Sequence, residues 1–124
     1  MDDEDIVRTV AGKMLEFLGY EAVLVRSGEA AVETYQAHQA SGKPFAAVIL
    51  DWLVVDGMDG FKTLERLRRI DPGVKGILSS GYPEQDQGAA TLSAGFASVI
   101  GKPYEMKTLK ETLERVVGEI RERV

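Results

Sequence analysis

The sequence predicts a three-layer α/β domain built around a mostly parallel sheet. Short apolar segments alternate along the chain with segments whose apolar residues recur at helical spacing. Strands that alternate with helices in this way indicate βα units joined by right-handed crossovers. The chain has 124 residues, of which 44% are hydrophobic, and this suits one domain with a buried core. We therefore expect residues 1–124 to form a single domain.

The boundaries of the elements follow from the apolar pattern and from turn residues. Ser27 is a suitable N-cap for the second helix, and Asp71-Pro72-Gly73 ends the third. Segment 85–95 is only a weak helix, because it contains Gly88 and lacks a strong apolar stripe. The other expected helices are residues 5–18, 28–40, 61–70 and 106–124, and the expected strands are 22–26, 46–50, 76–80 and 97–101.

The composition excludes several classes of function. A net charge of −5 argues against a surface for nucleic acid or for an anionic membrane. The chain has no Cys, so disulfides and thiolate metal sites are excluded. No apolar run approaches the roughly 18 residues of a transmembrane helix, and the acidic N-terminus is unlike a signal peptide. We expect a cytoplasmic protein with no nucleic-acid or membrane partner.

Charged and polar residues follow the expected strands at their carboxyl ends, where ligand sites gather in parallel sheets. A pair of acidic residues also stands just before the first helix, where a preceding strand would end. The candidate site residues are Asp51, Ser79, Ser80 and Lys102 at strand ends, with Asp2 and Asp3 as the acidic pair. Only one of the two serines can face Asp51.

These residue types suit phosphoryl transfer. Neighbouring carboxylates repel one another unless a cation joins them, and oxygen ligands suit Mg²⁺. A carboxylate can also attack phosphorus and form an aspartyl phosphate. Lysine binds phosphate as a point charge, and a serine hydroxyl can donate to a phosphoryl oxygen. The residues alone therefore predict phosphoryl transfer to Asp51, with charge neutralised by Mg²⁺ and Lys102.

Four motifs in their order along the chain resemble the signature of the receiver domain of two-component response regulators. The motifs are DDEDIVR (2–8), VILDWLVVDGMDG (48–60), ILSSGYP (77–83) and IGKPY (100–104), and the resemblance covers essentially the whole chain. It implies a flavodoxin-like fold, with a five-stranded parallel sheet in the order 2-1-3-4-5 flanked by five helices. It also implies Mg²⁺ as cofactor and a histidine kinase or phosphotransfer protein as the partner that donates the phosphoryl group.

The resemblance also assigns roles by position. Asp51 would be the phosphoacceptor, and Ser79 and Lys102 would contact the phosphoryl group. The ligands of Mg²⁺ would be Asp2, Asp3, Asp51 and the backbone carbonyl of Leu53, with Asp3 the more direct ligand of the acidic pair. The Lys102–Pro103 peptide bond is expected to be cis, as it usually is in that family.

The chain departs from the family pattern after Asp51 and before Lys102. The loop from Asp51 to Gly60 is one residue longer than the commonest version, with Val55 where proline is usual. Such loops resemble those of receiver domains attached to hybrid sensor kinases. Val99 stands three residues before Lys102, where many receivers carry a switching Tyr or Phe. Activation would then work through the loop after Ser79 and the weak helix 85–95.

The largest departure is the first strand. In a receiver domain an apolar central strand precedes the acidic pair, and here only Met1 precedes Asp2. About five buried apolar residues would contribute ~8–15 kcal/mol, against a whole-domain stability of about 5–15 kcal/mol. Three explanations are open. The native product could begin upstream, or a homo-oligomer could exchange a strand. Alternatively, the two strands that flank the missing one could pair directly and displace Asp2 and Asp3. We favour the first biologically, and for the chain as given we expect a distorted or domain-swapped, N-terminally truncated receiver.

Three functions remain to be compared. The leading one is a phosphoacceptor module that switches protein interactions with an unknown downstream target and is not an enzyme beyond its own phosphorylation and dephosphorylation. The alternative is a pseudo-receiver, a protein-interaction scaffold of the same fold that is not phosphorylated. A flavodoxin-like nucleotide or flavin binder is disfavoured, because the first turn carries acids where a phosphate cradle needs glycine and backbone N–H groups.

Overall fold

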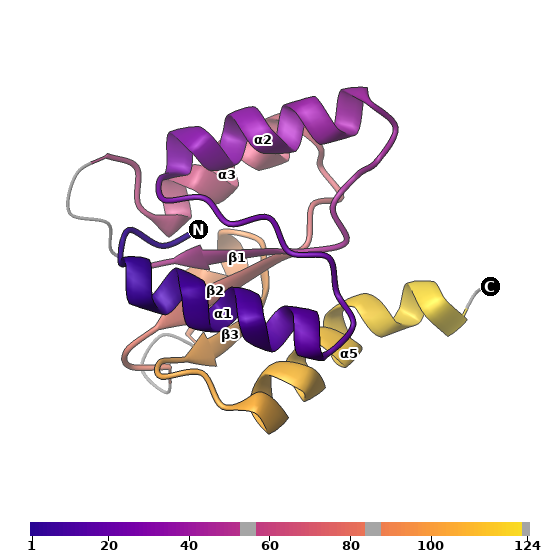
Figure 1. Cartoon of the computed structure of the whole chain (residues 1–124). Coiled ribbons are helices and arrows are strands. Elements are labelled where there is room, and N and C mark those ends of the chain that lie inside the picture. Colours follow the sequence, from indigo (N-terminus) through magenta and orange to yellow (C-terminus); the bar gives the residue numbers. More distant parts are fainter. Residues whose placement is uncertain (53–56, 84–87, 123–124) are drawn as a thin grey trace.

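The computed structural model of the chain describes residues 1–52, 57–83 and 88–122. Helices cover both faces of a central sheet, which gives the three layers expected for an α/β domain (Figure 1). The elements are α1 (Asp5–Phe17), α2 (Gly28–Ala40), β1 (Val48–Asp51), α3 (Gly60–Ile70), β2 (Gly76–Ser80), α4 (Ala89–Ser93), β3 (Phe96–Gly101) and α5 (Met106–Glu122). None of the described helices is both long enough and apolar enough to span a membrane.

In the described part of the chain the sheet has three parallel strands in the order β1-β2-β3. All of β2 is buried, as expected for the middle strand of a sheet covered on both faces. The register sets Asp51 of β1 opposite Ser79 of β2, and Ser79 opposite Ile100 of β3. The ends of the three strands therefore lie at one edge of the sheet.

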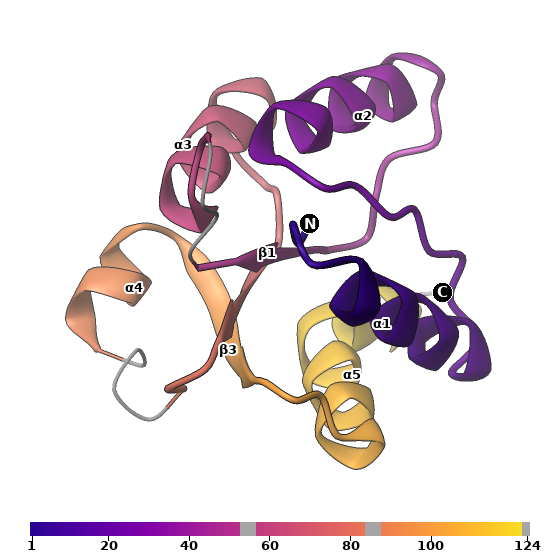
Figure 2. The same ribbon diagram turned by 60° about the vertical axis from the view of Figure 1, so that its left-hand side comes forward.

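Each face of the sheet has its own apolar cluster. Val32, Tyr35, Leu50, Leu64, Leu67, Val74, Leu78 and Phe96 pack between the sheet and the α2–α3 layer. Ile77, Ile100, Leu109, Leu113, Val116 and Val117 pack on the opposite face, with Met14, Leu15 and Leu18 of α1 against them. Alternate residues of one strand serve the two clusters, as the period of two in a strand requires. Figure 2 shows α1 beside α5 and α2 beside α3.

Local chemistry explains where the helices begin. Ser27 accepts a hydrogen bond from the Ala30 N–H at 3.1 Å, and it is the N-cap of α2 as predicted. Asp59 caps α3 in the same way by accepting from the Lys62 N–H at 2.9 Å. Asp59 thus serves the start of this helix.

Most of the predicted elements agree with the structure to within two residues. The prediction of a strand at 76–80 and a helix at 28–40 is confirmed residue for residue. The first and third helices and the last strand are displaced by one residue at one end, and β1 lies two residues later than predicted at its start. The weak helix expected over 85–95 is the short α4, and residues 84–87 lie outside the described part.

The prediction of a strand over residues 22–26 is wrong. This segment carries no strand ladder among the described residues, although the Asp2 N–H donates to the Val25 carbonyl at 3.2 Å. Val23 and Leu24 are 44% and 47% exposed. A strand needs a continuous partner, and the expected central neighbour of this segment is missing. Residues 22–26 therefore follow the sheet without pairing to it.

A cavity of about 170 Å³ lies beside β1, on the side away from β2. It lies between β1 and the segment 20–25, and most of its lining is apolar, with Val7, Leu15, Val25, Ile49 and Leu113 among the lining residues. Direct pairing of residues 22–26 with β1, one of the expected alternatives, does not occur among the described residues, because this cavity separates them. Strand exchange between two copies stays a prediction.

Candidate functional site

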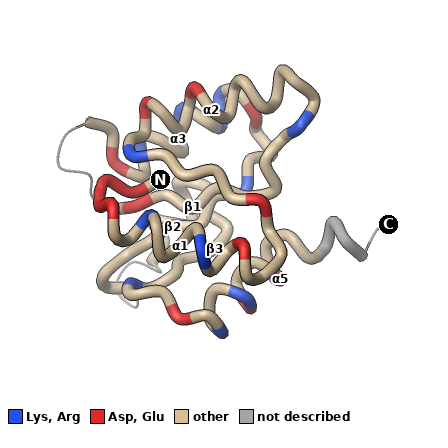
Figure 3. The backbone as a smooth tube through the Cα atoms, in the orientation of Figure 1, with Lys and Arg blue, Asp and Glu red and all other residues tan. Residues whose placement is uncertain are grey.

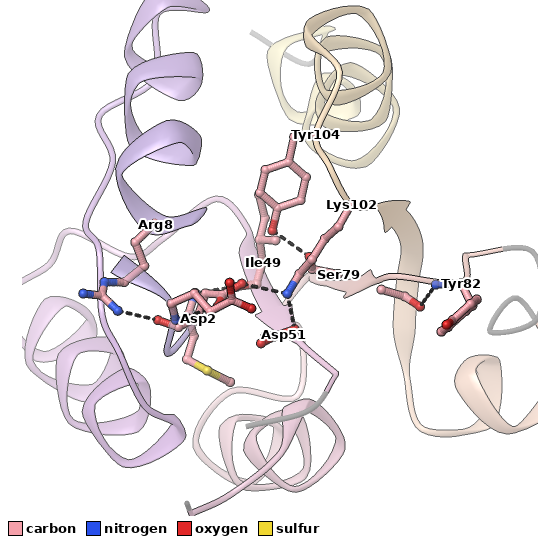
Figure 4. Close-up of polar contacts among 11 residues, drawn as sticks. Asp2, Arg8, Ile49, Asp51, Ser79, Tyr82, Lys102 and Tyr104 are labelled. Carbon is pink, nitrogen blue, oxygen red and sulfur yellow. Dashed lines mark hydrogen bonds and ion pairs between the residues drawn. The ribbon is translucent and has the colours of Figure 1, made fainter. Parts of the chain in front are cut away.

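Carboxylate, hydroxyl and ammonium groups lie close together at one edge of the sheet (Figure 4). They come from the ends of β1 and β2 and from the residue that follows β3. Asp51, the last residue of β1, is 4% exposed and lies in register with Ser79, which is fully buried. Lys102 follows β3, and its N–H donates to the Ser80 carbonyl at 2.8 Å. The Lys102–Pro103 peptide bond is cis, as expected. The structure thus gathers Asp51, Ser79 and Lys102 at the edge where the strands end.

Met1 and Asp2 take the place of the last two residues of a central strand. The Met1 nitrogen donates to the Ile49 carbonyl at 2.7 Å, and the Asp51 N–H donates to the Met1 carbonyl at 3.0 Å. On the other side the Asp2 N–H donates to the Val25 carbonyl. Asp2, which is 3% exposed, is therefore held beside Asp51 by backbone bonds on both of its sides.

Two further contacts orient Asp2. The Arg8 guanidinium donates to the Asp2 carbonyl at 2.8 Å, and the Glu4 N–H donates to the Asp2 carboxylate at 3.0 Å (Figure 4). Arg8 was not among the residues singled out from the sequence, where it is simply one charged residue of an amphipathic helix. Its role depends on a backbone contact, for which sequence offers no signal.

Lys102 forms the central ion pairs of the site. Its Nζ lies 2.6 Å from Asp51 Oδ1 and 2.9 Å from Asp2 Oδ2. Burial by itself would lower the pKa of Lys102, but hydrogen bonding to Asp51 and the neighbouring Asp2 carboxylate outweigh burial and raise this pKa. Burial raises the pKa of Asp51, and the charge of Asp2 raises it further, against the opposing effect of Lys102. The site thus favours the charged form of Lys102 and disfavours the charged form of Asp51.

The three carboxylates form a set that could hold a divalent cation. Oxygen atoms of Asp2, Asp3 and Asp51 lie within 4.8 Å of one another, and Figure 3 shows acidic residues gathered where the chain begins. Asp2 Oδ2 is buried and forms an ion pair with Lys102, but within the described part of the chain no hydrogen bond with suitable donor geometry reaches this oxygen. Three negative charges face one ammonium here, so an added cation would lower the repulsion. Leu53, expected to offer a carbonyl ligand, lies outside the described residues.

The two serines of β2 have different partners. Ser79 Oγ and the Tyr104 hydroxyl are 2.6 Å apart, whereas Ser80 Oγ accepts from the Tyr82 N–H at 2.9 Å. Ser80 therefore has a structural contact in the loop, as expected of the serine that does not face Asp51. Tyr104 was not singled out from the sequence, although it belongs to the quoted motif IGKPY. Only the fold, which turns the chain after Pro103, reveals its contact with Ser79.

Comparison with known proteins agrees with this arrangement. The family model described as the response regulator receiver domain matches residues 1–114. Transcriptional regulatory protein ZraR of Salmonella typhimurium is 27% identical over 122 residues, which cover 98% of this chain and 26% of that protein. Sensor kinase CckA of Brucella abortus is 35% identical over 93% of this chain and 12% of its own length. The chain thus spans about a quarter or less of these two relatives.

Other relatives are close to this chain in length. Response regulator receiver protein CpdR of Brucella abortus is 28% identical over 94% of this chain and 91% of its own length. The receiver domain of sensor histidine kinase PA1611 from Pseudomonas aeruginosa, solved with magnesium in its active-site cleft, is 25% identical with a TM-score of 0.79, and the match covers 95% of this chain and 93% of that one. A CheY-like receiver domain from Methanospirillum hungatei shares the fold with a TM-score of 0.82, at 24% identity over 99% of this chain and 94% of its own. The chain belongs to the response regulator receiver domain family.

Proposed function

We propose that this chain is a phosphoacceptor that takes a phosphoryl group onto Asp51 in the presence of Mg²⁺ and thereby switches its protein interactions. The observation that carries the proposal is the convergence of Asp2, Asp3 and Asp51 around Lys102. A scaffold without phosphorylation chemistry would have no need to bury two carboxylates against one ammonium, because burial of unbalanced charge is costly.

The phosphodonor in this proposal is a phosphohistidine of a histidine kinase or of a phosphotransfer protein. An Asp51 carboxylate oxygen attacks phosphorus and forms the O–P bond, while the P–N bond of the phosphohistidine breaks and its imidazole nitrogen keeps the electron pair. Lys102, already beside Asp51, stabilises the negative charge on the phosphoryl oxygens. Ser79 lies in register with Asp51 and can donate its hydroxyl proton to the same group.

Asp2, Asp3 and Asp51 would hold Mg²⁺, with the Leu53 carbonyl as the further ligand that the family resemblance implies. When bound, Mg²⁺ supplies positive charge that offsets the repulsion between the carboxylates and the phosphoryl oxygens. The donor set suits it, because Mg²⁺ takes one or two carboxylates and keeps several waters. The chain's own chemistry is confined to its phosphorylation and dephosphorylation, so it is not a metabolic enzyme. The proposed location is the cytoplasm, where such a phosphodonor would meet it.

Beryllofluoride with Mg²⁺ tests the proposal, since it mimics a phosphoryl group on a carboxylate. We expect the wild-type chain to bind it and to gain the mass of one phosphoryl group from acetyl phosphate. Asp51→Asn should abolish both results. Asp59→Asn is the matched control, because asparagine is also a good N-cap and the residue caps α3 outside the cluster. Failure of the wild type to respond to either reagent would leave the scaffold function as the better account.

A further inference from the structure

Tyr104 joins the phosphoryl site to the apolar core on the α1–α5 side of the sheet. Its hydroxyl lies 2.6 Å from Ser79 Oγ, and its ring packs against the cluster that contains Ile77, Leu109 and Leu113. Figure 4 shows the ring pointing from its place after Lys102 toward Ser79. Packing of the ring and hydrogen bonding of the hydroxyl therefore fix this side chain beside Ser79.

Each hydroxyl of this pair carries one proton and can also accept, so the 2.6 Å contact suits donation from either side. A tyrosine hydroxyl has one proton, and a serine hydroxyl has one proton and two lone pairs. Burial raises the pKa of Tyr104, so the phenol keeps its proton at physiological pH. Among the bonds of the described residues, Ser79 Oγ is the acceptor within reach of that proton. If Tyr104 donates, the Ser79 proton is free to turn toward the neighbouring strand end.

We propose that Tyr104 is a positioning residue that donates to Ser79 Oγ and directs the Ser79 proton toward a phosphoryl group on Asp51. This inference rests on the proposed function and adds to it a specific hydrogen-bond relay: phenol to serine to phosphoryl oxygen. Ser79 and Asp51 are partners in register on adjacent parallel strands, which places the serine next to the acceptor. Without the phenol, the Ser79 hydroxyl can rotate away from the phosphoryl oxygen and loses a fixed orientation.

Tyr104→Phe tests the relay, since it keeps the ring and removes only the hydroxyl. We expect its affinity for beryllofluoride with Mg²⁺, and its rate of phosphorylation by acetyl phosphate, to fall about three- to tenfold, as for one hydrogen bond. The affinity for Mg²⁺ alone should stay nearly the same, because the Tyr104 hydroxyl bonds Ser79 and is not among the three carboxylate ligands. Tyr82→Phe is the matched control, since the Tyr82 side chain is 70% exposed.

A double-mutant cycle separates the relay from a general packing role. In a Ser79→Ala background, Tyr104→Phe should have no further effect on beryllofluoride affinity, whereas in Ser79→Thr, which keeps a hydroxyl, the effect should persist. An equal loss with and without the Ser79 hydroxyl, or no loss in the wild-type background, overturns this inference alone. Absence of any beryllofluoride binding by the wild type overturns the proposed function and the relay together.

Discussion

Lys102 is the residue on which the electrostatic balance of the site depends. One ammonium contacts both Asp51 and Asp2, while Asp3 adds a third carboxylate nearby. The ammonium can offset one of these charges, and the remaining excess is negative. Binding of a divalent cation or of a proton by these carboxylates should therefore stabilise the folded protein. Metal binding and folding are then coupled.

Lys102→Met should therefore destabilise the protein when no divalent cation is present. Removal of Lys102 leaves the buried Asp2 and Asp51 carboxylates without its ammonium, at a cost of about 3 kcal/mol, the lower end of the range for buried pairs because 21% of the Lys102 side chain is exposed. Mg²⁺ should restore more stability to this variant than to the wild type. Urea unfolding with and without MgCl₂ measures both effects, with the exposed Lys107→Met as control. Equal stabilisation of both variants by Mg²⁺ would contradict this account.

At this scale the sequence predicts what the strand order determines and misses what depends on side-chain reach. Asp51, Ser79 and Lys102 end or follow apolar segments, so the rule that parallel strands end at one edge was enough to group them. Tyr104 lies two residues past Lys102, and its contact with Ser79 depends on how the chain turns there. Position relative to a strand end is readable from sequence, whereas the direction of a side chain in a turn is not.

At the scale of elements, α3 approaches β1 so closely that its first residue has no room for a side chain. A Cβ on Gly60 would lie 2.5 Å from the Asp51 carbonyl oxygen and 3.3 Å from Leu78. The Gly60 N–H also donates to the Trp52 carbonyl at 3.3 Å, just past the end of β1. The start of this helix thus packs directly on the backbone of Asp51, so a displacement of α3 would also move Asp51.

Gly60→Ala should destabilise the fold by about 1–3 kcal/mol, because backbone atoms must move to admit the methyl group. It should also weaken Mg²⁺ binding, since the Asp51 backbone is the part that must move. Gly118→Ala is the matched control: it lies inside α5 with no atom within 4 Å of its added Cβ, and should stabilise the helix by up to about 1 kcal/mol. Thermal unfolding and Mg²⁺ titration of both variants make the comparison. A Gly60→Ala protein as stable as the Gly118→Ala protein would show that α3 moves freely.

Element boundaries were predictable wherever an element finds its partner inside the chain. The strand at 76–80 has neighbours on both sides, and its prediction is confirmed residue for residue. Residues 22–26 have the same apolar character, but the partner that would pair with them is missing. An apolar segment indicates a capacity to form a strand, and the ladder forms only when a neighbour supplies the other half of the hydrogen bonds.

At the scale of the whole molecule, we expect Mg²⁺ and protons to compete for the carboxylates of Asp2, Asp3 and Asp51. Because burial raises the pKa of Asp51 in the folded chain, its favourable contribution to stability without metal is present at low pH and is lost as pH rises through that raised pKa. Mg²⁺ requires the ionised carboxylate, so its stabilising effect should grow over the same range. Mg²⁺ at about one hundred times its Kd should add about 2.7 kcal/mol, or roughly 10 °C in Tm.

Thermal unfolding across a pH series, with MgCl₂ or with NaCl of equal ionic strength, measures this difference. The gain in Tm from Mg²⁺ should increase as pH rises from below to above the pKa of Asp51 and then level off. Asp51→Asn should flatten the curve, because it removes the group that titrates. A gain that is constant from acid to neutral pH would place the ion somewhere other than the Asp2–Asp3–Asp51 cluster.

The cavity beside β1 leads to the last prediction, which concerns the whole fold. The Val48 N–H points toward β2, and backbone groups of successive residues in a strand point to alternate sides. The N–H of Ile49 and the carbonyl of Ala47 therefore point to the other side, toward the cavity. The Asp51 N–H points the same way and donates to Met1. An apolar segment of about five residues joined ahead of Met1 could enter parallel to β1. Burial of its apolar side chains would contribute ~8–15 kcal/mol to stability, and ordering its backbone would cost ~5–10 kcal/mol. The free energy of unfolding would therefore rise by about 3–5 kcal/mol. Filling the cavity of 170 Å³ gives a similar value of about 4 kcal/mol.

Such an extension would also convert the buried amino group of Met1, whose pKa burial lowers to about 6, into an uncharged amide. We therefore expect an extension of alternating Val and Ile to raise the free energy of urea unfolding by several kcal/mol, and a Gly-Ser extension of equal length to leave it unchanged. Light scattering on both proteins measures their oligomeric state. If the unextended chain associates by exchanging strands, the apolar extension should turn it into a monomer, because the cavity is then filled within one chain. Equal stability of the two extended proteins would mean that the chain closes this space by a rearrangement of residues 20–25 instead.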